Sequence, residues 1–310
     1  MSASQDDASR PQGGCVVGLG QVTVEQLGVG PRSPEAVVEL SAFSMQAGGA
    51  IGTTLATVAA LGGKARYMGR LSNDDLGNIA LRGLKEFGVD VSMVLIEPGR
   101  VSPTSFILVD DRTARRLVRY TRGDTSPLVP GELPRTLFDG ASALVVDGRS
   151  PAPQIAAAER AKALGLTVIL DARHLGPGMG ELLDLCDVVI GNERFAAEFS
   201  HSADTKRSLT ELVKMGPRTA VITLGEEGAI GMEDDKLVRR PALDLDVLDR
   251  TGASEVFRGA FIYGLLQGWN LDRCLPFANA AAGLNCRHLG GLGGIPALPE
   301  ILEVAGLNAR

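Results

Sequence analysis

The residues best suited to do chemistry lie near the C-terminus, in the stretch LDRTGASEVFRGAF from Leu248 to Phe261. Three small residues there, Gly252, Ala253 and Ser254, can form a tight turn, and an acidic residue, Glu255, follows at once. Apolar residues then recur at helical spacing. The stretch therefore predicts a loop that runs into a helix with a carboxylate in its first turn.

Such a helix start is suited to phosphate chemistry. Its unpaired backbone N–H groups and partial positive charge attract anions. In phosphoryl transfer these N–H groups stabilise the moving phosphate, and a neighbouring carboxylate can take the proton from the attacking hydroxyl. Taken alone, the stretch fits two interpretations equally: a phosphate site with Glu255 as the base, or an ordinary helix start with an acid in its first turn.

The composition of the whole chain argues against several other functions. Its 310 residues carry 31 basic and 37 acidic side chains, a net charge of −6, and they form no basic stripe, so we expect no nucleic-acid partner. Its apolar runs are strand-sized, so we expect no membrane span. The four cysteines and three histidines lack ligand spacing, so we expect buried, reduced thiols and a cytoplasmic location.

Strand-like and helix-like segments alternate from residue 141 onward, which predicts a parallel sheet with helices on both faces. Segments 21–45 and 101–122 are hairpin-like, and we expect them to form a small separate sheet over one end of the main sheet. The strand ends VVDG, ILDAR, VIGN and ITLGEEG should share one rim, because ligands bind beyond the carboxyl ends of parallel strands.

The same pass along the chain predicts the domain boundaries. Residues 1–13 are polar and expected to be a disordered tail, 14–300 the α/β domain, and 301–310 a C-terminal tail.

Two glycine-containing segments need a separate interpretation. GLGQVTVEQLG begins like a dinucleotide-binding fingerprint, but Thr23 stands where the third glycine belongs and no acidic residue follows at the expected distance, so we reject that reading. TLGEEG, from Thr223 to Gly228, is a strand end followed by a glycine-bounded turn. By itself it fits either an ordinary hairpin or a ligand site.

Four motifs in order resemble the ribokinase (PfkB) family of carbohydrate and nucleoside kinases, from about Cys15 to Pro296. They are the pair Gly48 and Gly49 before a small-residue helix, then GRLSNDDLG, ITLGEEG and DRTGASEVFRGAF, the last being similar to the family's DTTGAGDAFxGAF. The resemblance implies a ribokinase-like α/β fold, doubly wound around a mostly parallel sheet and carrying a small β-sheet lid.

The resemblance also implies an ATP- and Mg²⁺-dependent phosphoryl transfer to a hydroxyl of a sugar or nucleoside-like molecule. By position, Glu255 is the base and Gly252, Ala253 and Ser254 form the anion hole. The other implied residues are Thr223, Gly225, Gly228 and Asn192 at the nucleotide; Glu25, Gly48, Gly49, Thr53 and Asp147 at the substrate; and Asp249 and Thr251 where many members bind a monovalent cation such as K⁺. A lid sheet would also have open edges that favour pairing, so a homodimer through the lid is a further expectation.

The chain departs from the family's pattern at five positions of this site. Glu255 and Glu25 each stand in place of an aspartate, Ser254 in place of a glycine, Arg250 in place of a small polar residue, and Phe195 in place of the glutamate of NxxE. A glutamate extends the carboxylate by about 1 Å, and a displacement on that scale can cost about a hundredfold in rate. Arg250 fits either a phosphate-binding charge or a solvated side chain.

The sequence therefore leaves two functions open. One is a kinase with Glu255 as its base. The other is a catalytically impaired kinase-fold protein that binds a ligand or partner without phosphoryl transfer.

Overall fold

The computed structural model describes residues 14–31 and 37–308. The tail expected at residues 1–13 lies outside these residues.

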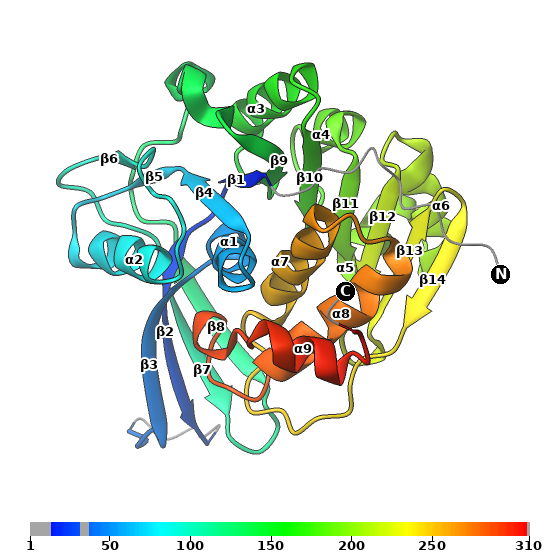
Figure 1. The fold of residues 1–310 in the computed structure, drawn as a ribbon. Coiled ribbons are helices and arrows are strands. Elements are labelled where there is room, and N and C mark those ends of the chain that lie inside the picture. The colour runs from blue at the N-terminus through cyan, green and yellow to red at the C-terminus, as the bar shows by residue number, and fades with distance from the viewer. Residues whose placement is uncertain (1–13, 32–36, 309–310) are drawn as a thin grey trace.

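The main sheet has eight strands in the order β14-β13-β12-β11-β10-β9-β1-β4 (Figure 1). The strands are β1 (Cys15–Leu19), β4 (Lys64–Met68), β9 (Ala141–Val146), β10 (Thr167–Ala172), β11 (Val188–Asn192), β12 (Thr219–Thr223), β13 (Ala229–Glu233) and β14 (Lys236–Arg240). Neighbours from β4 to β12 pair in parallel, and β13 and β14 add an antiparallel edge. The expected mostly parallel sheet is confirmed.

Helices cover both faces of this sheet, as expected for a doubly wound fold (Figure 1). One face packs against α1 (Ala50–Ala60), α2 (Asp75–Glu86), α7 (Ala253–Leu266), α8 (Leu271–Asn285) and α9 (Leu298–Val304). The other packs against α3 (Pro151–Ala163), α4 (Met179–Leu185), α5 (Glu193–Ser200) and α6 (Thr205–Lys214). Successive strand residues alternate between these two cores because strand side chains point to opposite faces; Val16 belongs to the first core and Val17 to the second.

A second sheet of four strands stands apart from the first, in the order β3-β2-β7-β8 (Figure 1). Its strands are β2 (Thr23–Gly30), β3 (Ala42–Gly48), β7 (Thr104–Asp110) and β8 (Arg116–Thr121). β2 pairs antiparallel with β3 and parallel with β7, which pairs antiparallel with β8. This is the lid expected from segments 21–45 and 101–122. Its buried residues Leu27, Val29, Ile107 and Val109 pack with Leu289.

The remaining elements are short. β5 (Arg70–Leu71) pairs with β6 (Leu95–Ile96), and single 3₁₀ turns cover Pro130–Glu132, Arg135–Phe138, Gly225–Glu227 and Leu292–Gly294. The boundary expected at residue 300 falls inside α9, where Ile301 is fully buried in the core. All four cysteines are buried. Of the helices in the described ranges, none has the length and apolar character needed to cross a membrane.

Candidate active site

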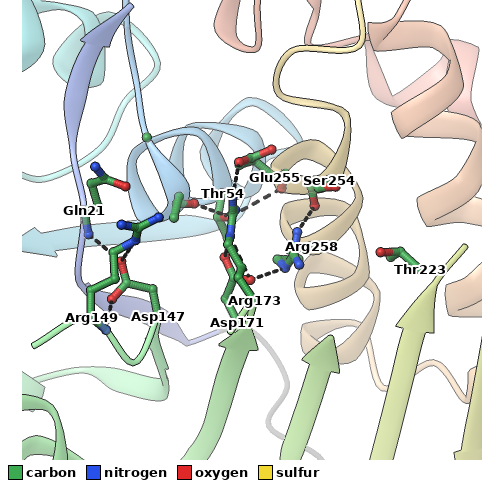
Figure 2. Close-up of polar contacts among 12 residues, drawn as sticks. Gln21, Thr54, Asp147, Arg149, Asp171, Arg173, Thr223, Ser254, Glu255 and Arg258 are labelled. Atoms are coloured by element: carbon green, nitrogen blue, oxygen red, sulfur yellow. Dashed lines mark hydrogen bonds and ion pairs between the residues drawn. The ribbon is translucent and has the colours of Figure 1, made fainter. Parts of the chain in front are cut away.

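Polar residues from several parallel strands meet at the carboxyl edge of the main sheet, facing the start of α7 (Figure 2). Gln21 follows β1, and Asp147 and Arg149 follow β9. Asp171 is the next-to-last residue of β10, Arg173 follows that strand, and Thr223 ends β12. Because β9 to β12 are consecutive neighbours in one sheet, the four strand ends singled out in the sequence do share one rim.

The loop before α7 turns at Gly252, whose φ is 81°. A Cβ atom here would lie 2.1 Å from the Cα of Gly291, so only glycine fits both the backbone angle and the space. Ala253, Ser254 and Glu255 then form the first turn of the helix. Serine is accommodated in place of the family's glycine because Ser254 has an ordinary helical backbone. Within the described chain no side chain caps α7, which leaves its first N–H groups available to an anion.

A pocket of about 280 Å³ opens beside this helix start. Thr223, Gly225 and Gly228 line it together with Ala253 and Ser254. Leu243, Leu245, Val247, Phe257 and Ala282 give it apolar walls. Five of the seven residues that the sequence assigned to the nucleotide and to the anion hole therefore face one space, and Gly252 and Asn192 are not part of its lining. Their roles in binding stay predictions.

Arg250 and Glu226 also line this pocket and form an ion pair with each other. Arg250 is 44% exposed. Its charge therefore lies near the proposed phosphate site, but it is shared with a carboxylate.

Asn192 and Phe195 are not part of the pocket lining, although Asn192 pairs with the lining residue Thr223 across β11 and β12. The Asn192 side chain accepts a hydrogen bond from the Phe195 backbone N–H, at 2.8 Å, and so caps α5. The Phe195 ring is fully buried beneath the sheet and stacks on Phe199, with ring centroids 6.0 Å apart. The position where the family has a glutamate is thus a core position here and supplies no charge.

Four charged side chains form a network at the centre of the rim, in which Asp171 and Arg258 are buried and Arg173 and Glu255 are partly buried (Figure 2). Arg173 bonds Asp171 through Nε and Nη2, at 3.1 and 3.0 Å, while its Nη1 lies 2.7 Å from Oε1 of Glu255. The Nε of Arg258 lies 2.6 Å from Oδ1 of Asp171, and its Nη1 donates to the carbonyl oxygen of Ser254. The two positive and two negative charges give the network no net charge, which reduces the free-energy cost of burying it.

This network sets the protonation state of Glu255. Burial by itself would raise the pKa of the carboxyl, but the guanidinium groups of Arg173 and Arg258 outweigh it and lower the pKa to about 2. Glu255 is therefore ionised at neutral pH and held by a cation. Its basicity as a proton acceptor would rise if that ion pair loosened.

Glu25 of the lid has the opposite environment. One carboxylate oxygen accepts from the Gly49 backbone N–H at 3.4 Å, and the other is buried without a hydrogen-bond partner among the described residues. Burial, followed by repulsion from Glu255, raises the pKa of Glu25 to about 7. A Cβ at Gly48 would lie 2.4 Å from the Glu25 carboxyl carbon, so the glycine makes room for this side chain. An unpartnered buried carboxyl group beside the rim is suited to bind a hydroxyl of a ligand.

The other predicted substrate residues are firmly anchored. Asp147 is buried, and its carboxylate accepts from the N–H groups of Gln21, at 2.7 Å, and Arg149, at 3.0 Å, and from the Gln154 amide, at 2.8 Å. Thr53 is buried in α1.

Asp249 and Thr251, the predicted cation residues, organise the loop before α7. Asp249 accepts from the Thr251 N–H and hydroxyl, at 2.9 and 2.8 Å, and from the Gly290 N–H, at 2.8 Å. All of this is buried. The described ranges contain no cluster of three or more His, Cys, Asp or Glu side chains suited to a metal. A role in binding K⁺ stays a prediction.

Sequence reasoning missed four residues of the rim: Arg149, Asp171, Arg173 and Arg258. A signal was present, because the strand ends VVDGR and ILDAR both contain Asp-x-Arg. Glu255 and Arg258 also stand at i and i+3 of one helix, a spacing at which side chains are neighbours.

Comparisons with known proteins bear on this site and fold. A sequence model described as pfkB family carbohydrate kinase matches residues 15–298. An ATP-dependent ribose-1-phosphate kinase of Halopiger xanaduensis is 29% identical, over 84% of this chain and 87% of that protein. A ribokinase of Staphylococcus aureus is 25% identical, over 93% and 99%.

Solved structures share the fold at lower identity. Arabidopsis thaliana ribokinase complexed with ribose and ATP superposes with a TM-score of 0.80, at 21% identity, over 96% of this chain and 100% of that one. A protein named Ribokinase II from E. coli, in complex with ATP and Mg²⁺, gives a TM-score of 0.84 at 19% identity, over 94% and 99%. With a family match over nearly the whole sequence and this shared architecture, the chain belongs to the pfkB family of carbohydrate kinases.

Proposed function

We propose that this protein is a kinase that transfers the γ-phosphoryl group of ATP to a hydroxyl of a sugar or nucleoside-like small molecule. The observation that carries the proposal is the position of Glu255. It lies in the first turn of an uncapped helix, between the pocket lined by Thr223 and Ser254 and the polar rim that holds Asp147. The relatives named as ribokinase and ribose-1-phosphate kinase support the same reaction class.

The pocket beside α7 fits the nucleotide in this proposal. Its apolar walls suit a base, while the uncapped helix start and Arg250 suit phosphates. Mg²⁺ bound with the nucleotide would supply charge neutralisation at the phosphates.

The reaction can be written in full. The acceptor hydroxyl oxygen forms a bond to the γ-phosphorus, and the bond from that phosphorus to the oxygen bridging the β- and γ-phosphates breaks, its electron pair leaving with ADP. The hydroxyl proton passes to a carboxylate oxygen of Glu255. Because the pKa of Glu255 is about 2, this transfer is favourable only late, once bonding to phosphorus has made the hydroxyl strongly acidic.

Two observations favour a second function, binding without phosphoryl transfer. The Glu255 carboxylate is already paired with Arg173 at 2.7 Å, and Phe195 supplies an apolar ring where the family has an acid. A protein with this site could bind a nucleotide or sugar and leave it unchanged.

Turnover and binding measured together separate the two functions. Purified protein with ATP and Mg²⁺ is assayed for ADP release against a panel of sugars, nucleosides and their acid and phosphate derivatives. Phosphorus NMR identifies the product. ATP binding is measured separately by calorimetry. We expect product from at least one acceptor. ATP binding without product across the panel would favour the second function, and absence of both would contradict the two proposals.

Three further expectations belong to this proposal. Activity should be higher in K⁺ than in Na⁺ if Asp249 and Thr251 organise a cation site. The outer lid face exposes Phe43, Met45 and Phe106, so a homodimer through the lid is expected, with sedimentation equilibrium as its test. A cytoplasmic location stays a prediction that fractionation would check.

A further inference from the structure

Two neighbouring strands end in the same short pattern, Asp-x-Arg. β9 is followed by Asp147 and Arg149, whereas Asp171 is the next-to-last residue of β10 and Arg173 follows that strand. The strands pair in parallel with Val146 opposite Leu170, so each aspartate comes one residue after this matched pair. The two arginines therefore leave the sheet at matching positions, and both lie at the rim that faces Glu255 (Figure 2).

The aspartate of each pattern is buried, but the two arginines are engaged differently. Arg173 makes a close two-point contact with Asp171 and directs Nη1 to Glu255. The Nε of Arg149 lies 4.0 Å from Asp147, beyond hydrogen-bond distance, and its side chain is 37% exposed.

Asp147 does not depend on the Arg149 guanidinium. Its oxygens already accept three hydrogen bonds, from the backbone N–H groups of Gln21 and Arg149 and from the amide of Gln154. The Arg149 guanidinium therefore keeps most of its capacity to bind an anion, at the edge of the same site in which Arg173 faces Glu255.

We propose that Arg149 and Arg173 together bind an anionic group of the acceptor, a carboxylate or a phosphate, and that this contact draws Arg173 away from Glu255. This rests on the proposed kinase function for the identity of the ligand as acceptor. Two guanidinium groups present planar sets of donors that match the oxygens of either anion. An acceptor with such a group frees the Glu255 carboxylate as it binds, whereas a neutral acceptor leaves the carboxylate paired.

The test uses matched acceptors that differ only in charge: ribose, ribonate, ribose 1-phosphate and ribose 5-phosphate. Binding of each is measured by calorimetry with ADP and Mg²⁺ present, and kcat/KM is measured with ATP. We expect at least one charged compound to exceed ribose by about tenfold or more in both measurements, the size of one charge-assisted contact. Whether the preferred compound is ribonate or a phosphate identifies which anion the site takes.

Variants assign the effect to the two arginines. The side chain of Arg149 is half-exposed and makes no close contact with Asp147. Arg149→Gln should therefore remove the preference for the charged compound and leave the KM for ATP unchanged. Arg173→Gln should lower kcat/KM for the charged acceptor and raise it for ribose, because Glu255 is then unpaired from the start. Arg207→Gln is the control, since Arg207 is exposed on α6 and pairs with Glu211 there.

The outcomes separate the proposed anion contact of Arg149 and Arg173 from the proposed kinase function. Turnover of ribose equal to that of every charged compound, or a charged-acceptor KM unchanged by Arg149→Gln, overturns the inference and leaves the kinase function standing. Binding of a charged compound that depends on Arg149, with no turnover of any compound, supports the inference and overturns the kinase function. Absence of binding by all three charged compounds overturns the inference.

Discussion

Removing one member of the buried charge network tests how Asp171, Arg173, Glu255 and Arg258 depend on one another. Asp171 and Arg258 are each about 1% exposed, and burial lowers the pKa of Arg258, which shows that its charge is costly to keep. Loss of one partner from a buried pair costs roughly 3–5 kcal/mol, because the other charge remains buried and unpaired.

The structure ranks the two single substitutions. Arg258→Met leaves Asp171 with its two contacts to Arg173, so we expect the free energy of unfolding to fall by about 3 kcal/mol, the lower end of that range. Asp171→Asn leaves the charges of Arg173 and Arg258 with Glu255 as the one remaining anion of the network, so we expect the free energy of unfolding to fall by about 5 kcal/mol. The double variant keeps the neutral Arg173–Glu255 pair and should cost at least about 2 kcal/mol less than the sum of the singles.

Urea unfolding followed by far-ultraviolet circular dichroism gives all of these free energies. Arg207→Met serves as the control, because the exposed Arg207–Glu211 pair on α6 should contribute less than about 1 kcal/mol. Single costs that simply add in the double variant would refute the reasoning, since the four charges would then not act as a unit.

Two other substitutions test the lid and the core beside the site. The pKa of Glu25 in the folded protein is about 7, above its ordinary value of 4.5. The buried carboxyl group therefore lowers the free energy of unfolding progressively as the pH rises from about 4.5 to 7. Glu25→Gln should stabilise the fold by up to about 3 kcal/mol at pH 8 and change its stability little at pH 4. An equal effect at both pH values in urea unfolding would contradict this. Phe195→Glu should destabilise the fold by about 3–5 kcal/mol and restore no activity, because it replaces a stacked core ring with a buried carboxyl group. Phe195→Leu keeps an apolar side chain there and should destabilise the fold by less than half as much. A stable Phe195→Glu variant with increased turnover would show that this position reaches the nucleotide after all.

Much of the fold could be predicted because its signals are local. The small residues before Glu255 predicted a helix start, and the alternating patterns predicted both the parallel sheet and the lid. The rim followed from one rule, that parallel strands bring their carboxyl ends to the same edge.

The network around Glu255 could not be predicted in the same way, because its ion pairs join β10 to α7, which are far apart in the chain. The Asp-x-Arg pattern and the Glu255–Arg258 spacing were visible, yet neither tells which side chains meet across the site. Phe195 illustrates a second limit. Alignment to the NxxE motif placed Phe195 where the family has a glutamate of the site, whereas its apolar ring is buried in the core against Phe199.

The most direct test of the central claim, that Glu255 receives the acceptor's proton, is the single-turnover rate of γ-phosphoryl transfer in Glu255→Gln and Glu255→Asp beside the wild type. With ATP binding by calorimetry as the check on folding, Glu255→Gln should lose about 10²-fold or more in rate, because it keeps the shape and removes the base. Glu255→Asp should retain or exceed the wild-type rate, since it restores the family's residue and lengthens the contact with Arg173. A wild-type rate that survives Glu255→Gln would contradict the account, because the proton would then leave by another route.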